Sequence, residues 1–328
     1  MRLIRYADNI IDAMRLYAPD HILLQCLNRD GYACRNTKYV PLTMPDGSIA
    51  QVKESRPTDF FRGECQDHVS CKAGLYRGKD RSKRILELLK TYHFICYLKE
   101  HPVIREWVFN RCYVDYWMLA QHYEFMTPLL DLTDEISTAA FFATHRYDRV
   151  IKDYVVKEDG VGIIRHYKGE LRVDGTLRPV GVQPMARPSQ QDGVALWLDA
   201  EDDFADLSDK VVFKQDRKIN LQLKRAMLGG TDFFPPEPVT MMAATIREGN
   251  LMTSNAIEAM LHDIDEGVEY IKPVVSEKEI VQVLKDNDYH IVDTEMISYM
   301  VPPNPDFHKI RKVLIKPAWR SGKRLQNL

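Results

Sequence analysis

Apolar residues at helical spacing account for most of the hydrophobic pattern of this 328-residue chain. The longest stripe lies in 82–107, where Ile85, Leu88 and Tyr92 share one face until Pro102 interrupts the helix. The same spacing predicts one or two short helices in 1–35. Further helices are predicted at 219–228, 238–247, 255–262 and 276–285.

Strand patterns are fewer and shorter. Residues 38–53 predict a β-hairpin whose turn is Asp46-Gly47. Further strands are predicted at 160–167, 194–198, 211–213 and 312–315. The chain has no internal repeats. Its mixture of predicted helices and strands indicates an α+β fold, with a mixed sheet core, flanking helices, and helical additions at both ends.

The segment 117–143 is the centre of the pattern. Trp117 and Tyr123 lie on one face of a predicted helix, and Pro128 rules out a continuous helix through the residues that follow. Thr133 is predicted to N-cap a second helix, with Asp134 and Glu135 in its first turn. The small apolar run 139–143 places this second helix in the core.

Polar residues gather between these two helices. Gln121 and His122 enter on the apolar side of the first helix, and Thr127, Asp131 and Thr133 follow at the edge of a buried element. A buried polar group without a partner costs roughly 1–3 kcal/mol. This junction is therefore either a satisfied structural cluster or a functional site.

Two aromatic-Arg-Gly triplets precede the centre, at 61–63 and 76–78. They predict two short strands or turns that present the guanidinium groups of Arg62 and Arg77. The glycine after each arginine allows another backbone, or a ligand, to approach closely.

Composition limits the function classes. The apolar and charged fractions, 45% and 28%, are those of an ordinary globular protein, and a net charge of −2 argues against bulk attraction to nucleic acid or membrane. No apolar run reaches the ~20 residues of a membrane span.

Six cysteines without a C-x-x-C pair favour free thiols in the cytoplasm. The spacing of Cys65, His68 and Cys71 is compact enough for zinc, but no second ligand pair lies nearby, so no metal is expected. The tail from Lys309 holds seven basic residues, which indicate either a small anion-binding patch or a solvated end.

These residues resemble the FRG domain family, which is named for its aromatic-Arg-Gly motif. The matching pieces are the two triplets, LAQHYEFMTPLLDLT at 119–133, the helix through 139–143, RPSQQDG at 187–193 and LKRAMLGGTDFFPP at 223–236. The resemblance spans 55–250, which separates an N-terminal part (1–54, helices and hairpin) from a C-terminal helical extension with the basic tail (251–328). Pro128 replaces an arginine that the family usually has, and Asp192 is inserted between Gln191 and Gly193.

The chemistry of the matching residues suits a nucleotide. Arg62 and Arg77 are planar cations suited to phosphate, and His122 can transfer a proton near neutral pH. Asp131 can orient that histidine. The candidate ligand-binding residues are completed by Thr127, Gln190 and Gln191.

A weaker resemblance to the ADP-ribosyltransferases, by analogy of fold, implies a specific reaction. It implies that Arg62 holds the phosphates of NAD while a carboxylate stabilises the ribosyl transition state. The usual late glutamate is missing, and Asp192 is the nearest candidate. The resemblance to the FRG family further implies a toxin or phage-defence setting.

Three other interpretations stay open. One is a module that senses or binds a nucleotide, a nucleic acid or a protein without turnover. Another is a ribonuclease with His122 as general base, for which a second histidine, such as His145 or His166, is not assigned. The last is structural: a buried Arg62–Asp131 ion pair, a core histidine at 122, capping threonines, and Gln190-Gln191 on a surface edge.

Overall fold

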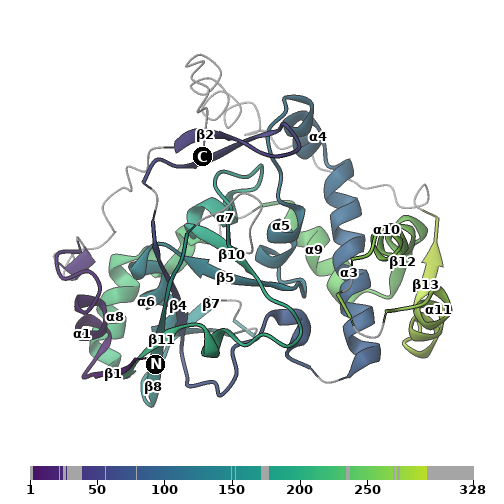
Figure 1. Ribbon diagram of the computed structural model, residues 1–328. Helices are drawn as coiled ribbons and strands as arrows, with labels where there is room; N and C mark the ends of the chain where they lie inside the picture. The colour runs from purple at the N-terminus through teal and green to yellow at the C-terminus, as the bar shows by residue number, and fades with distance from the viewer. Residues whose placement is uncertain are drawn as a thin grey trace.

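The computed structural model (Figure 1) describes part of the 328 residues. The described residues are 3–21, 23–24, 27, 39–55, 57–78, 80–148, 150–151, 153–170, 177–233, 237–268, 270–271 and 274–293. The predicted strand at 312–315 and the basic tail lie outside them.

A seven-stranded mixed sheet forms the centre of the fold, in the order β1-β11-β8-β4-β5-β10-β9. The strands are β1 (Ile4–Ala7), β11 (Asp209–Lys214), β8 (Val161–Lys168), β4 (Asp59–Glu64), β5 (Leu129–Thr133), β10 (Gly193–Trp197) and β9 (Leu177–Pro179). β1 runs parallel to β11, and every other neighbouring pair is antiparallel.

Helices cover both faces of the sheet. Alternation along β4 places Phe60 and Phe61 in two different core clusters. The Phe61 side is covered by α1 (Ile10–Arg15), α6 (Ile136–Thr144) and α8 (Arg217–Ala226). On the other side, the long α3 stands between the sheet and the C-terminal helices (Figure 1).

The remaining elements complete the frame. They are the helices α3 (Arg81–Glu100), α4 (Pro102–Phe109), α5 (Tyr116–His122), α7 (Ala186–Gln190), α9 (Val239–Glu248), α10 (Ser254–Asp265) and α11 (Glu277–Asp286), and the short 3-10 helices η1 (Gly74–Tyr76), η2 (Phe204–Asp206) and η3 (Leu228–Phe233). Three two-stranded sheets lie outside the central one: β2 (Tyr39–Thr43) with β3 (Ile49–Lys53), β6 (His145–Asp148) with β7 (Asp153–Val156), and β12 (Leu251–Thr253) with β13 (His290–Val292). No helix in the described ranges combines the length and apolar character needed to cross a bilayer.

The predicted α+β class is confirmed. The long apolar stripe forms α3 and α4, which are separated where Pro102 begins the second helix. The predicted hairpin is β2–β3, with Gly47 at φ +81° in its turn. Strands β1, β5, β6, β7, β9, β12 and β13 were not predicted. The proposed division at residue 54 stays a prediction, although β1 pairs within the central sheet and α1 shares a core cluster with α6.

The predicted cap at Thr133 is wrong. Thr133 is the last residue of β5, where it pairs with Phe61 on one side and Gly193 on the other. The N-cap of α6 is Glu135, whose side chain accepts a hydrogen bond from the Ser137 N–H. Thr133 Oγ1 instead accepts from the Glu135 N–H at 3.1 Å, a turn between strand and helix. Sheet pairing thus moves the helix start two residues onward, so Asp134 and Glu135 precede the first turn.

The sheet is split at its centre. β4 pairs with β8 on one side at six consecutive positions. On its other side, β4 pairs with β5 only at Phe61 and Thr133. Every residue of β4 and β5 is described, and beyond this one pair the two strands are not hydrogen-bonded to each other as a ladder. The split creates the space in which the site lies.

Candidate functional site

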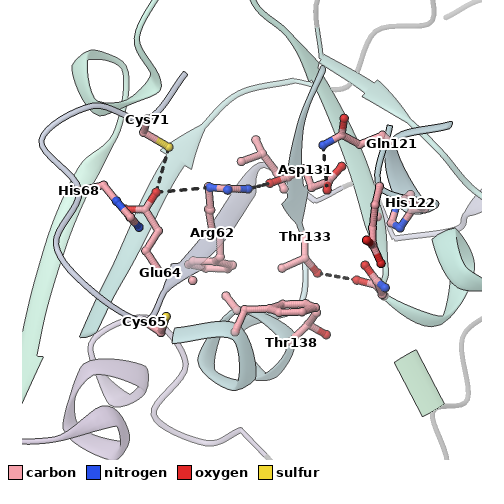
Figure 2. A pocket seen from close by; sticks show the side chains of 18 of the residues that line it. Arg62, Glu64, Cys65, His68, Cys71, Gln121, His122, Asp131, Thr133 and Thr138 are labelled. Atoms are coloured by element: carbon pink, nitrogen blue, oxygen red, sulfur yellow. Dashed lines mark hydrogen bonds and ion pairs between the residues drawn. The ribbon is translucent and has the colours of Figure 1, made fainter. Parts of the chain in front are cut away.

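A cavity of about 430 Å³ opens where β4 and β5 separate (Figure 2). The lining comes from β4 and the segment after it, β5, the C-terminal end of α5, one face of α6, β7 and the start of β10. It consists of residues 61–65, His68, Ser70, Cys71, Arg77, Gln121, His122, Glu124, residues 131–133, Thr138, Ala139, Phe142, Tyr154, Gln191 and Gly193.

Arg62 spans the split. Its Nη1 donates to the main-chain carbonyl of Asp131 at 2.9 Å, so a side chain replaces a hydrogen bond that a continuous ladder would supply. Its Nε lies 3.4 Å from Glu64 Oε1, and Figure 2 shows the guanidinium between Glu64 and Asp131. The carboxylate paired with Arg62 is therefore that of Glu64. This corrects the structural alternative of an Arg62–Asp131 ion pair.

Glu64 is the buried acid of the site, and sequence reasoning did not identify it. Arg165 Nε donates to Glu64 Oε2 at 2.9 Å, and the Cys71 thiol donates to Oε1 at 3.0 Å. Burial alone would raise the pKa of Glu64, but Arg62, the Cys71 hydrogen bond and Arg165 outweigh it and lower the pKa. Glu64 is thus an ionised anchor for both arginines. Its position two residues after Arg62, on the same face of a strand, was the available signal.

Arg77 is the more accessible cation. It follows η1, its side chain is exposed, and its Nε donates to the Lys72 carbonyl at 3.1 Å. No ion pair joins it to an acidic side chain in the described part of the chain. Local desolvation and the nearby charge of Arg62 lower the pKa of Arg77. Arg62 and Arg77 thus line one cavity with the carboxylates of Glu64, Glu124 and Asp131, and in the described residues Arg77 forms an ion pair with none of them.

Asp131 is held by a short polar relay. Thr127 donates from Oγ1 to Gln121 Oε1, and Gln121 Nε2 donates to Asp131 Oδ2 at 3.3 Å. Asp131 Oδ1 is buried and has no hydrogen-bond partner among the described residues. Thr127 is fully buried and is not one of the lining residues, so its role is to position Gln121.

His122 ends α5 and lines the cavity with only 6% of its surface exposed. Its Nε2 is buried, and no described group hydrogen-bonds to it. Burial lowers the pKa of His122, so the imidazole is neutral at pH 7. Gly193 provides the room for this ring, because a Cβ there would lie 3.1 Å from His122 Nε2.

The 190–192 segment is divided. Gln191 lines the cavity, its Nε2 donates to the Phe233 carbonyl at 3.1 Å, and its own carbonyl accepts from Thr133 Oγ1. Gln190 is exposed and outside the lining. Asp192 has φ +49° and lies 2.6 Å from Lys53, outside the lining as well. Of the three predicted residues, only Gln191 reaches the site.

Several lining residues were not singled out as members of the functional site. They are His68, Glu124, Thr138, Phe142 and Tyr154. Glu124 adopts φ +70°, a backbone conformation that favours glycine. The two cysteines considered for zinc line the same cavity as His68, but among the described residues no three His, Cys, Asp or Glu side chains are grouped to hold a metal ion.

Fold and site together define an α+β protein with a polar, arginine-lined cavity in a split sheet. Residues 58–150 match the family model of the FRG domain, so the chain contains an FRG domain and the resemblance is confirmed there. The match includes Arg62, Arg77, His122 and Asp131, and it ends before the predicted pieces at 187–193 and 223–236. A search of curated proteins and a search of solved structures found no match.

Proposed function

We propose that the cavity binds a nucleotide, and that its reaction is cleavage of NAD, with transfer of the ADP-ribosyl group to water or to an acceptor. The observation that carries the proposal is the presence of Arg62, Arg77 and the unpartnered oxygen of Asp131 in one cavity. Cations suit the phosphates, and a carboxylate with one oxygen that no described group hydrogen-bonds to suits the positive charge that develops on the ribose.

Size and charge support a nucleotide. A volume near 430 Å³ lies in the range of sites for small molecules, roughly 300–1,000 Å³. Glu64 shares its charge between Arg62 and Arg165, and Glu124 is paired with Arg247 at 2.8 Å. Arg77 therefore remains available for a phosphate, to which a guanidinium can donate two parallel hydrogen bonds.

The proposed chemistry assigns each group one role. The bond between ribose C1′ and the nicotinamide nitrogen breaks, and its electron pair leaves with nicotinamide. The Asp131 carboxylate stabilises the charge at C1′. The neutral His122 imidazole accepts the proton of the attacking water or hydroxyl, whose oxygen bonds to C1′. Asp131 thus takes the role first considered for Asp192, because Asp192 is held by Lys53 outside the cavity.

One observation favours a second candidate, a ribonuclease. Figure 2 shows His68 and His122 on opposite sides of Arg62, and both line the cavity. The histidines considered from sequence lie elsewhere: His145 Nδ1 contacts the Phe141 carbonyl, and His166 contacts Asp59. An RNA phosphate held by the arginines would have a base on one side and an acid on the other. Cleavage of RNA that requires both His68 and His122 would support this reaction over NAD cleavage.

Replacing Arg77 with alanine is expected to weaken NAD binding by about 10- to 100-fold, because a charged hydrogen bond contributes about 1.5–3 kcal/mol. The melting temperature without ligand should stay unchanged, since the side chain is exposed and donates one described hydrogen bond. Calorimetric titration with NAD measures the affinity. Arg217→Ala is the matched control, because Arg217 is an exposed arginine paired with Glu158 outside the cavity.

Incubation with NAD, with nicotinamide release as the readout, separates binding from turnover. Release that disappears in Asp131→Asn would support the reaction. Binding without release would contradict the reaction and leave a nucleotide-binding module. An intact protein that neither binds nor cleaves NAD or other nucleotides would contradict the whole proposal.

A further inference from the structure

An aromatic corner forms part of the same cavity, and neither the arginines nor the acid and base groups account for it. Phe142 belongs to the face of α6 that also presents Thr138 and Ala139 to the cavity, and Tyr154 comes from β7. Both rings are partly exposed. The third phenyl ring among the described lining residues, that of Phe61, is 6% exposed and packs into a core cluster. Phe142 and Tyr154 therefore present more of their ring surface at the cavity than Phe61 does.

The rings are braced in fixed orientations. Phe142 and Tyr154 meet edge to face, with centroids 5.9 Å apart and planes at 70°. Behind them, Phe233 stacks on Phe142 with centroids 5.8 Å apart and planes at 27°. Tyr154 also contacts the buried Phe141 at 5.3 Å. The corner is thus a rigid surface on which a flat ring can stack at little cost in side-chain entropy.

A polar group borders this corner. The Gln191 amide donates to the carbonyl of Phe233, the residue that supports Phe142, and Gln191 itself lines the cavity. Burial raises the pKa of the Tyr154 phenol above its ordinary value, so the hydroxyl stays neutral and does not repel an anionic ligand.

We infer that Phe142 and Tyr154 form a stacking subsite for the heteroaromatic ring of the ligand, while Arg62 and Arg77 hold its phosphate. This inference rests on the proposed nucleotide-binding function and narrows it. The ligand must carry both a flat ring and a phosphate, as nucleotides do. Pyrophosphate and sugar phosphates without a base would use only the arginines.

Two substitutions test the subsite. Phe142→Leu and Tyr154→Leu remove one ring each and keep an apolar side chain. Stacking of a base on an aromatic side chain predicts that either change weakens binding of NAD and AMP by about 5- to 100-fold. Binding of pyrophosphate should stay within about twofold of wild type, because it touches only the arginines. Tyr147→Leu is the matched control: Tyr147 lies on the same hairpin, contacts Tyr154 at 5.3 Å and is outside the cavity lining.

The ligand series distinguishes the two levels of proposal. Affinities are measured by calorimetry on variants whose far-ultraviolet spectrum and melting temperature match wild type, which is the reason for having two ring variants. If wild type binds NAD and both variants bind it equally well, the subsite is wrong and the nucleotide proposal stands. The subsite is also wrong if the variants lose pyrophosphate and NAD in equal measure. If wild type binds no nucleotide, the proposed function itself has failed.

Discussion

Replacing Gly63 with alanine is expected to destabilise the protein by about 3 kcal/mol or more, or to prevent folding. A Cβ at this position would lie 1.8 Å from the carbonyl oxygen of Ala139 and 2.7 Å from the Ala143 nitrogen. Both atoms belong to the backbone of α6, which cannot move aside as the end of a flexible side chain can. Urea unfolding followed by circular dichroism measures the change in the free energy of unfolding.

The second aromatic-Arg-Gly triplet supplies the matched control. Gly78 also follows an arginine, but a Cβ there would meet nothing within 4 Å. Gly78→Ala should therefore change the free energy of unfolding by less than about 0.5 kcal/mol. Equal losses in the two variants would show that close packing of α6 on β4 is not what the first glycine provides. The sequence predicted close approach by a backbone or a ligand, and at Gly63 it is a backbone.

Replacing Lys53 with methionine is expected to cost about 3–5 kcal/mol at pH 8, because two buried carboxylates lose their shared cation. Lys53 Nζ lies 2.6 Å from Asp134 and 2.6 Å from Asp192, whose side chains are 8% and 3% exposed. These contacts fix the β2–β3 hairpin to the ends of β5 and β10. Lys210→Met is the control, since Lys210 pairs with the exposed Asp67 and should cost less than about 1 kcal/mol.

The cost of Lys53→Met should depend on pH. The pKa of Asp134 is raised to about 6: burial is the largest cause, Lys53 opposes it, and the charges of Asp192 and Glu135 add to the rise. Because this folded pKa exceeds the unfolded value near ~3.9, the folded state binds more protons, and stability falls as pH rises through this window. Lys53, whose pKa is raised, stays charged at pH 5 and at pH 8.

Without Lys53, the pKa of Asp134 should rise still higher, so at pH 5 its carboxyl group is protonated and needs no cation. The loss in the free energy of unfolding should therefore be smaller at pH 5 than at pH 8. Urea unfolding at the two pH values measures it. Identical losses would mean that the ionised carboxylates do not set the cost.

Local pattern accounts for the parts of the fold that the sequence predicted. The apolar stripe of α3 and the Asp-Gly turn of β2–β3 each lie within one short segment of the sequence, and both elements were predicted correctly from them. β5 was missed because Pro128 precedes it and Asp131 interrupts its apolar run, so neither a helical nor a strand period stands out. The edge strands β1 and β9, with four and three residues, are too short to show a period.

The site divides in the same way. Motif residues that lie close together in sequence, such as Gln121, His122 and Asp131, could be proposed as one group. Contacts between distant segments could not. Glu64 accepts a hydrogen bond from Arg165, 101 positions away in the sequence. Asp192 pairs with Lys53 and has a positive φ, and neither its contact nor its backbone conformation could be predicted from its position in the sequence. Phe142 and Tyr154 reach the cavity through packing of α6 and of the β6–β7 hairpin, which no local period encodes.

The separation of β4 from β5 has a mechanical consequence. The central sheet behaves as two ribbons, β1-β11-β8-β4 and β5-β10-β9, that share a single rung at Phe61 and Thr133. The Arg62 side chain supplies one further tie across the gap. A ligand seated there contacts both ribbons and therefore acts as a clamp between them. A ligand that binds only when the two ribbons are in contact stabilises that contact by mass action. The ligand concentration should therefore set how cooperatively the two ribbons unfold.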